Sequence, residues 1–343
     1  MSDPTPAERG YRMPAEWEPH AATWLSWPHN RETWPGAFDT IPGVWTELVR
    51  TLATSEPVMI LAGGAEVLAD AQQHVGDVPR VTFFDIRTDD AWTRDHGPTF
   101  LVGNAAQQPA LVNWEYNAWG GKYPPFDNDN RVGRQLAERL GYQRYSPGIV
   151  CEGGAVDVNG RGTVLTTPDC ILNPNRNPGL SRSDAEHIFA AHLNAPHVVW
   201  LSGGLAGDDT DGHVDQMTRF VGPRSVLTMA EEDRRDPNHK PLAENLAHLR
   251  TVCDQDGRPL EVIPLQMPPP IYFDDHRLPA SYANFYVANE VVVVPTFAAP
   301  SDQAAIETIG KLFPDRRTVG LPAVDLVWGL GAFHCVTQQQ PAT

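Results

Sequence analysis

The sequence lacks the features of several large classes of protein. None of its apolar runs approaches the length of a membrane span, and its first 20 residues contain no signal-peptide core. It has 26 Lys and Arg against 43 Asp and Glu, a net charge of -17, whereas a nucleic-acid partner demands a basic surface. We therefore expect a cytoplasmic protein with no membrane or nucleic-acid partner, whose charge favours encounter with small cations.

Cysteine is scarce as well, and its spacing excludes the usual cysteine-based scaffolds. The cysteines lie far apart with no Cys-x-x-Cys pair, which predicts neither a zinc site nor a disulfide framework. We expect reduced thiols, most of them buried, with no metal and no cofactor. The open question is whether one of them is reactive. They are Cys151, Cys170, Cys253 and Cys335.

The sequence does contain a regular alternation of helical and strand-like segments. Its 343 residues, 41% of them hydrophobic, suffice for a large packed core. Apolar residues recur at three- and four-residue steps in five segments, which predicts five amphipathic helices. These lie at 41–54, 129–140, 181–193, 240–256 and 301–313.

Strand-like runs follow every predicted helix, and the helices from 129 onward start about sixty residues apart. A unit of one helix and then three strands, used five times, predicts a single catalytic α/β domain over residues 1–343 that closes into a ring. The early run 21–27 could supply the strand that the last unit lacks. The other predicted strands are 57–62, 81–85, 99–102, 111–114, 142–146, 149–158, 162–167, 198–201, 213–221, 225–229, 260–265, 282–287, 291–295, 318–321 and 333–337.

A ring of this kind would bring distant residues together. In the predicted units, reactive side chains lie at or just before the second or central strand, and equivalent strand ends converge on the axis of a pseudo-symmetric ring. Residues scattered from 95 to 335 would then line a single pocket. They are Asp95, Glu152, His213, Asp215 and Cys335.

The run from Gly207 to Asp215 places four carboxylates and one imidazole within nine residues. With residues 216–221 it predicts a loop that enters a strand, on which His213 and Asp215 would share a face. Such a pair can move protons or hold a cation. Asp and His are also metal ligands, but the calcium-loop pattern fails because Val214 stands where that loop needs glycine.

Cys335 follows a glycine-containing segment that includes Gly329 and Gly331. Glycines before a short strand allow the backbone to approach a ligand closely. A thiol at this place could be a nucleophile if a cation or a base is near, and is otherwise a small core residue. Local sequence alone leaves both interpretations open.

Two further segments carry polar groups in apolar surroundings. Residues 92–98 follow an apolar strand, at a strand mouth where loops often carry sites, although alone they fit an ordinary turn capped by Asp95. Glu152 precedes Gly153 and Gly154 within an apolar strand context, where a carboxylate is costly to bury without a partner. The Glu152 carboxylate is therefore expected either to face solvent or to pair with a buried cation or histidine.

Together these segments resemble the agmatine deiminases, which belong to the guanidine-modifying (pentein) superfamily and are related to bacterial-type peptidylarginine deiminases. The resemblance covers nearly the whole sequence, with several uncommon motifs in the same order. It implies a five-bladed pseudo-symmetric α/β propeller, the pentein fold, and a homo-oligomer. The motifs are residues 13–20, 92–98, 152–154, 172–178, 208–215, 281–286 and 334–339.

The resemblance implies catalytic roles for five residues. Cys335 matches the nucleophile of the family, and His213 matches its general acid/base. Glu152 matches the partner of that histidine. Asp95 and Asp215 match the two carboxylates that grip the guanidinium group of the substrate.

Three further residues are expected to contact the substrate. Asp209 falls where related enzymes place an acid facing the distal amine, Trp92 matches a substrate-contacting aromatic, and Gly331 should border the substrate. The resemblance implies that agmatine, a small cationic guanidine, is hydrolysed to N-carbamoylputrescine and ammonia. The reaction would pass through a thiouronium intermediate on Cys335 and need no metal.

The chemical properties of a guanidinium lead to the same set of groups without reference to the family. A guanidinium is planar, stays protonated and resists attack because its charge is delocalised. Two carboxylates can hold it beside sulfur, and an imidazole can protonate the nitrogen that leaves.

One segment departs from the family pattern. Many relatives carry Gly-Gly-Gly-Asn-Ile before the His-Cys pair, whereas residues 329–333 read Gly-Leu-Gly-Ala-Phe here. Free or peptidyl arginine therefore remains open as the substrate, as does a catalytically silent propeller that binds polyamines. A cysteine-dependent amidase of another type fits less well, because its expected Lys or Glu arrangement is missing.

Overall fold

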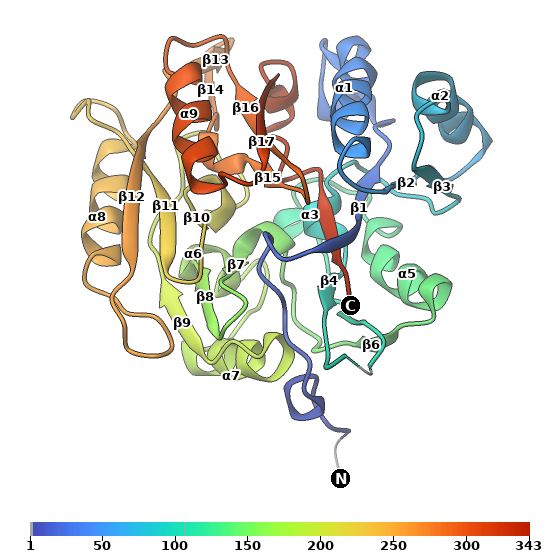
Figure 1. Cartoon of the computed structure of the whole chain (residues 1–343). Coiled ribbons are helices and arrows are strands. Elements are labelled where there is room, and N and C mark those ends of the chain that lie inside the picture. The colour runs from blue at the N-terminus through green and yellow to red at the C-terminus, as the bar shows by residue number, and fades with distance from the viewer. Residues whose placement is uncertain (1–2, 106) are drawn as a thin grey trace.

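The computed structural model describes residues 3–105 and 107–343, and a helix lies in each of the five segments where the sequence predicts one. Each buries an apolar stripe, as Leu48, Val49 and Leu52 do in the first of them. Figure 1 shows these helices around the outside of the molecule. They are α1 (Ile41–Ala53), α5 (Val132–Leu140), α7 (Arg182–Leu193), α8 (His239–Leu249) and α9 (Asp302–Leu312).

Two helical segments differ from the prediction. Helix α8 ends at Leu249 instead of continuing to 256, because the Asp254 carboxylate accepts from the backbone N–H groups of Asp256 and Arg258 and closes a turn. Helix α2 (Ala65–Val75) was not predicted and occupies the insertion after α1. The shorter helices are α3 (Thr93–His96), α4 (Ala118–Gly121), α6 (Pro168–Ile171), and the 3-10 turns η1 (Ala7–Arg9), η2 (Arg31–Thr33), η3 (Phe38–Thr40), η4 (Asp129–Arg131), η5 (Gly153–Ala155), η6 (Val214–Gln216), η7 (Tyr282–Asn284) and η8 (Leu326–Gly329).

The strands of the described residues form five sheets of three or four strands and one separate hairpin. In sheet order they are β18 (Gln338–Pro341), β1 (His20–Ser26), β2 (Val58–Leu61) and β3 (Val81–Phe84); β4 (Thr99–Leu101), β5 (Ala110–Val112) and β6 (Gln143–Tyr145); β7 (Val156–Val158), β8 (Thr163–Thr166) and β9 (His197–Trp200); β10 (Thr218–Phe220), β11 (Ser225–Ala230) and β12 (Glu261–Gln266); β15 (Tyr286–Val287), β16 (Val291–Thr296) and β17 (Arg317–Pro322); and the hairpin β13 (Ile271–Phe273) with β14 (His276–Leu278).

Four of the sheets share one plan. Two antiparallel strands come first, a long helix follows, and the next strand pairs in parallel with the second strand, as β12 does with β11 after α8. A helix is the usual crossover between parallel strands. The strand after each of these four helices therefore joins the sheet of the two strands before that helix, where it pairs with the second of them, and the expected grouping with the two strands after it is wrong.

The remaining sheet joins the two ends of the described chain. Strand β1 pairs in parallel with β2 and antiparallel with β18, which is the last strand. The prediction that the run 21–27 supplies the missing strand is therefore confirmed. The register includes Thr23 opposite Gln339 and Trp24 opposite Gln338.

Four predicted strands contain a turn where strand was expected. In the runs 149–158, 213–221 and 282–287 the turns η5, η6 and η7 come before the strands β7, β10 and β15. The run 333–337 contains no strand, and its backbone turns so that Thr337 N–H donates to the His334 carbonyl at 3.1 Å. The prediction that His213 and Asp215 share a strand face is wrong, because Val214–Gln216 is a 3-10 turn.

The architecture is α/β, as predicted. Among the helices of residues 3–105 and 107–343, none has the length and apolar character needed to cross a membrane. The arrangement of the sheets as five blades around an axis stays a prediction.

Candidate active site

Short turns at the start of the sheets meet in the interior. Turn α3 contacts η5, η5 contacts η6, and η6 contacts η7. Each precedes the first strand of its sheet, and residues 334–337 precede β18 in the same way. The first strand lies at a sheet edge. The expectation that the reactive residues lie at or before the central strand is therefore corrected to the edge strand.

These turns carry the five predicted catalytic residues. Asp95 lies in α3, Glu152 directly precedes η5, His213 precedes η6, Asp215 lies in η6, and Cys335 lies in the last turn. All five are buried, with at most 4% of their surface exposed. The structure thus brings together residues that are distant in the sequence.

The thiol of Cys335 lies among polar groups. Its Sγ is 3.1 Å from the amide nitrogen Nδ2 of Asn284, 3.6 Å from Oδ2 of Asp215 and 3.8 Å from Nε2 of Gln216. Burial raises the pKa of Cys335 well above its ordinary value, as do the charges of Asp215 and Asp95. In the free protein this sulfur is therefore a thiol.

The imidazole of His213 lies between two carboxylates. Its Nδ1 is 3.7 Å from Oδ1 of Asp95, and its Nε2 is 4.0 Å from Oε2 of Glu152. Neither ring nitrogen has a hydrogen-bond partner among the residues that the structure describes. Burial opposes the charged ring, but Asp95, Glu152 and Asp215 outweigh it and raise the pKa of His213 above its ordinary value. The ring is thus prepared to carry and donate a proton.

The two carboxylates expected to hold a guanidinium differ in their surroundings. Burial raises the pKa of Asp95 to about 6, although Gly154 N–H and the indole N–H of Trp119 each donate to it at 2.9 Å. Burial also opposes ionisation of Asp215, but the imidazole of His334 at 2.7 Å lowers the pKa of that carboxyl below its ordinary value. Oδ1 of Asp215 is buried without a hydrogen-bond partner in the described chain. It is therefore free to bind a cation.

Gly154 lets these groups approach one another. A methyl group at this position would lie 2.6 Å from Nδ1 of His213, 2.9 Å from Oδ2 of Asp215 and 2.9 Å from Oδ1 of Asp95. Such distances are shorter than van der Waals contact. The site requires glycine here because a side chain would occupy the space between three of its polar groups.

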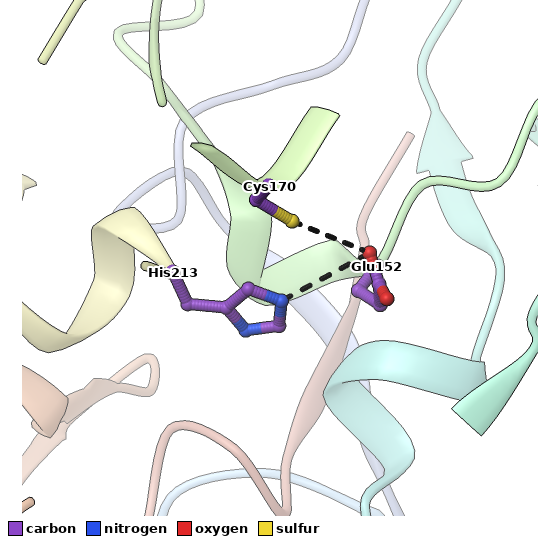
Figure 2. Close-up of side chains that lie close together, drawn as sticks. All are labelled: Glu152, Cys170 and His213. Atoms are coloured by element: carbon purple, nitrogen blue, oxygen red, sulfur yellow. Dashed lines mark hydrogen bonds and ion pairs between the residues drawn. The ribbon is translucent and has the colours of Figure 1, made fainter. Parts of the chain in front are cut away.

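Behind His213, Glu152 binds two further side chains. Arg176 Nε donates to Oε1 of Glu152 at 2.6 Å. The Cys170 thiol donates to Oε2 of Glu152 at 3.6 Å (Figure 2). A histidine, a thiol and a carboxylate this close, with ligand atoms within 4.8 Å of one another, could in principle hold a metal ion. However, Arg176 already neutralises Glu152, while burial and the Glu152 charge raise the pKa of Cys170 well above its ordinary value. A protonated thiol is a poor ligand, so the contacts fit a hydrogen-bonded network better.

A cavity of about 760 Å³ reaches the thiol, and Trp92, Asp95, Asp209, Gly331 and Cys335 all line it. The ring of Trp92 packs against Gly331, where an added methyl group would lie 2.5 Å from the indole and 3.0 Å from Cβ of Cys335. Gly331 is thus required by close packing at Cys335. Four of the five predicted substrate-binding residues therefore line one cavity, and the fifth, Asp215, lies behind its wall, 3.6 Å from the Cys335 sulfur.

Asp209 lies at the exposed side of this cavity. Its carboxylate accepts a hydrogen bond from the hydroxyl of Tyr123, and Lys122 donates to its backbone carbonyl. Tyr123 is half-exposed, and Lys122 also pairs with Asp211 at 3.0 Å. The Asp209 carboxylate therefore lies at the exposed end of the cavity, and Cys335 lies at the buried end.

Several residues that the structure places in the site were not assigned a role from the sequence. Asn284 lies in η7, the one converging turn of the described residues for which no site residue was predicted. The predicted catalytic residues precede the first strands of their sheets, so the equivalent place before β15 could have indicated Asn284. Arg176 lies in the motif 172–178, which supported the resemblance but received no function. Trp119 gave no signal, because its backbone (φ 53°, ψ 45°) is left-handed and its contact with Asp95 depends on the tertiary fold.

The comparisons with known proteins agree with this geometry. The chain matches the family of Porphyromonas-type peptidyl-arginine deiminases over residues 12–341. It is 37% identical to the agmatine deiminase of Ectopseudomonas mendocina and 37% identical to that of Stutzerimonas stutzeri, each match covering 98% of this chain and 97% of the relative. The agmatine deiminase of Enterococcus faecalis superposes with a TM-score of 0.93 at 30% identity, covering 99% of this chain and 98% of that one. The chain therefore belongs to the family of Porphyromonas-type peptidyl-arginine deiminases.

Proposed function

We propose that the protein is a hydrolase that converts agmatine and water into N-carbamoylputrescine and ammonia. One observation carries the proposal: a thiol, an imidazole without hydrogen-bond partners and two carboxylates meet in one buried region at a cavity of about 760 Å³. The agmatine deiminases among its relatives, similar over nearly their whole length, support the same substrate.

The carboxylates of Asp95 and Asp215 are suited to hold the guanidinium. A planar cation with several N–H donors can donate to both acids at once, and the unpartnered Oδ1 of Asp215 supplies an acceptor. The arrangement would fix the central carbon of the guanidinium beside Sγ of Cys335, because that sulfur is 3.6 Å from Asp215.

Binding of the substrate would also activate the thiol. Asp95 and Asp215 raise the pKa of Cys335, and a guanidinium bound between them supplies a positive charge that opposes both. The thiol then loses its proton to water, and the sulfur attacks the guanidinium carbon. The Nδ2 amide of Asn284, at 3.1 Å, donates to the thiolate while it forms.

His213 would transfer the protons of both half-reactions. As an imidazolium it donates a proton to one nitrogen of the tetrahedral adduct, the C–N bond breaks, and ammonia leaves a thiouronium on Cys335. The neutral ring then takes a proton from water, hydroxide adds to the same carbon, and the C–S bond breaks. The hydroxyl proton of the product passes to the sulfur, which restores the Cys335 thiol, and N-carbamoylputrescine is released. The carboxylates of Asp95 and Glu152, one near each ring nitrogen, stabilise the positive charge of the His213 ring.

The cavity supports a cationic chain with a second charge. Asp209 lies at the exposed side of the cavity, and we infer that its carboxylate pairs with the distal ammonium of agmatine. Trp92, packed on Gly331, would border the aliphatic chain of the substrate.

A second candidate is deimination of free or peptidyl arginine. The name of the matched family and the departure at 329–333 favour it, since Leu330 lines the cavity where many relatives have glycine. Leu330 adopts φ 71°, a left-handed conformation that costs a non-glycine residue energy. An arginine substrate would bring a carboxylate towards Asp209, and this repulsion favours agmatine.

An ammonia-release assay tests the assignment. Purified protein is incubated with agmatine, arginine and an arginine-containing peptide, beside the variant Cys335→Ala and the control Cys253→Ala, which alters a partly exposed cysteine. Agmatine should release ammonia in the wild type and the control only. Release from arginine or the peptide alone would reject agmatine, and release from no guanidine would reject the enzyme and favour a silent polyamine-binding protein.

Three further inferences concern the arrangement of the sheets, the oligomeric state and the cellular location of the protein. We infer that the five sheets are the blades of a propeller within one catalytic domain, because four of them share one strand plan and the fifth joins β18 to β1. We also infer a homo-oligomer in the cytoplasm. These inferences rest on the resemblance to the family.

A further inference from the structure

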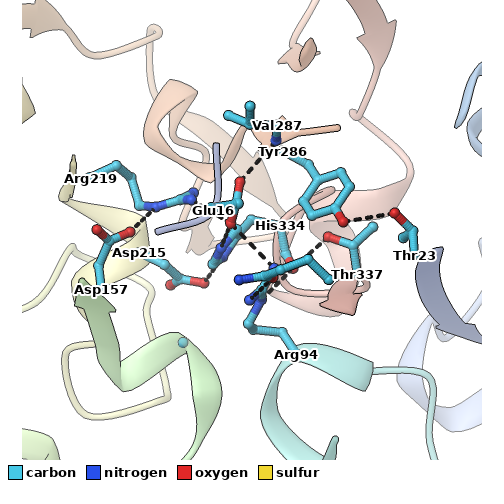
Figure 3. A network of polar contacts seen from close by, with 12 residues as sticks. Glu16, Thr23, Arg94, Asp157, Asp215, Arg219, Tyr286, Val287, His334 and Thr337 are labelled. Atoms are coloured by element: carbon cyan, nitrogen blue, oxygen red, sulfur yellow. Dashed lines mark hydrogen bonds and ion pairs between the residues drawn. The ribbon is translucent and has the colours of Figure 1, made fainter. Parts of the chain in front are cut away.

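A buried polar network lies beneath the candidate site, and its centre is a residue from the N-terminal segment. Oε2 of Glu16 accepts from Nη2 of Arg219 at 2.8 Å, from Nε2 of His334 at 2.9 Å and from Nη2 of Arg94 at 3.4 Å (Figure 3). Its Oε1 accepts from the backbone N–H of Val287 at 2.9 Å. These contacts join the segment before β1 to four distant parts of the chain.

His334 connects this network to the site. Its Nε2 contacts Glu16, and its Nδ1 lies 2.7 Å from Oδ2 of Asp215. Burial opposes ionisation of Glu16, yet Arg219, His334 and Arg94 lower the pKa of that carboxyl well below its ordinary value. The pKa of Asp215 is also lowered, so both acids are ionised and only accept hydrogen bonds.

The geometry therefore sets the protonation state of His334. A neutral imidazole carries one N–H, but both of its nitrogens face an oxygen of an ionised carboxylate. Only the imidazolium can donate to both. The ring is buried, which strengthens each of these charged hydrogen bonds.

We propose that His334 and Glu16 are positioning residues that keep Asp215 charged and hold its Oδ2, so that Oδ1 faces the guanidinium of the substrate. The proposal rests on the proposed function, because it assigns Asp215 to guanidinium binding. The observation behind it is the asymmetry of this carboxylate: Oδ2 is bound by His334, whereas Oδ1 has no partner within the described residues.

Other charges around Asp215 do not replace His334. His213 and Arg219 also lower the pKa of Asp215, but neither is hydrogen-bonded to it in the structure. Asp95 lies near Asp215, and the charge of Asp215 raises the pKa of Asp95. Among the described residues, His334 is thus the one cation in direct contact with Asp215.

The variant His334→Gln tests the proposal through the pH profile of kcat/KM for agmatine. Without the imidazolium, the pKa of Asp215 rises, so Asp215 takes up a proton at higher pH and no longer binds a cation. Asp95, whose pKa is about 6, also limits cation binding at low pH in the wild type. We therefore expect the pKa of Asp215 in the variant to rise above that of Asp95, the acid limb to move up by about one pH unit or more, and KM to rise at least about tenfold. A merely structural defect would lower activity at every pH without moving this limb.

The control is His74→Gln. His74 also contacts an acid, Asp70, at 3.5 Å, but no contact of its ring with Glu16, His334 or Asp215 is found among the described residues. Its acid limb should stay unmoved. Glu16→Gln should shift the limb in the same direction as His334→Gln by a smaller amount, since His334 then keeps one of its two acidic partners. An unmoved limb in folded His334→Gln protein overturns the proposal.

Nitrogen NMR of the wild-type imidazole provides a readout that needs neither turnover nor a variant. Both ring nitrogens of His334 should be protonated at neutral pH, and a neutral ring there would overturn the proposal even if His334→Gln fails to fold. Absence of ammonia release by the wild type from any guanidine would instead reject the proposed function.

Discussion

At the scale of single residues, the site combines groups whose charges are set by burial and by one another. Burial raises the pKa of Asp95 to about 6, whereas contact with His334 lowers that of Asp215. Burial and both acids keep Cys335 a thiol, while the acids around His213 favour its protonated form. Two carboxylates beside a neutral thiol are therefore available to bind a guanidinium.

The first prediction concerns Asp209. We expect Asp209→Asn to raise KM for agmatine about tenfold, because the distal ammonium loses a charged partner, and to leave n-butylguanidine, which lacks the amine, unchanged. Steady-state kinetics with both substrates measure the difference. Asp39→Asn, at an exposed aspartate, is the control. Equal losses for both substrates would place Asp209 away from the distal end.

The second prediction concerns the thiol. Because the pKa of Cys335 is raised well above its ordinary value, the neutral reagent iodoacetamide should modify it slowly at neutral pH and faster as pH rises. A cationic chloroacetamidine should react faster at neutral pH, since it carries the charge that lowers this pKa, and agmatine should protect. Peptide mapping follows Cys335, with Cys253 as the internal control. Equal neutral-pH rates for the two reagents would contradict this account.

Much of the residue-level site could be predicted from the sequence, since Asp95, Glu152, His213, Asp215 and Cys335 do meet. Their roles came from the resemblance to a family and stay predictions. The charge states could not be predicted, because they depend on burial and on distances of three to four ångströms between residues far apart in the chain.

At the scale of elements, the site is built from short turns instead of strands. His213, Asp215 and Asn284 lie in or beside 3-10 turns that precede edge strands. Successive side chains of a turn point in different directions. One turn can therefore place His213 and Asp215 on different sides of a bound guanidinium. The sequence predicted strands at these places because a turn of three residues is too short to show a helical period of its own. The turns were therefore read as part of the strands that follow them.

The third prediction concerns Gly154, where a methyl group would lie between 2.6 and 2.9 Å from three polar atoms of the site. We expect Gly154→Ala to lower kcat/KM at least about a hundredfold, because small displacements of reacting groups are costly. Gly43→Ala is the matched control, since an added methyl group at this exposed position in α1 contacts nothing within 4 Å. It should leave activity unchanged. Full activity of the Gly154 variant would refute the packing argument.

At the scale of the whole molecule, the two ends of the chain complete one sheet. Strand β18 pairs with β1, and the indole N–H of Trp24 donates to the side chain of Gln340 at 2.9 Å. The turn of Cys335 directly precedes β18. Closure of this sheet therefore holds the thiol in place, and the strand prediction for 21–27 anticipated it.

The fourth prediction tests that closure. Deletion of residues 338–343 removes β18, which is buried, and should lower the Tm by about 10 °C or more and abolish activity. Deletion of the exposed Thr343 alone is the control and should change neither. Thermal unfolding and ammonia release measure both effects. A truncated protein that unfolds like the wild type would show that β18 adds little to the fold.

The overall order of helices and strands followed from apolar periodicity, but the division of strands among sheets did not. A strand after a helix can pair forwards or backwards along the chain, and only the parallel crossover in the folded molecule, such as β11 to β12, decides between them.

The most direct test of the central claim is mass spectrometry of the protein quenched with acid during turnover of agmatine. The account predicts a covalent adduct, equal in composition to agmatine less one ammonia, on the peptide that contains Cys335. Turnover of agmatine without an adduct there, together with undiminished turnover by Cys335→Ala, would contradict it.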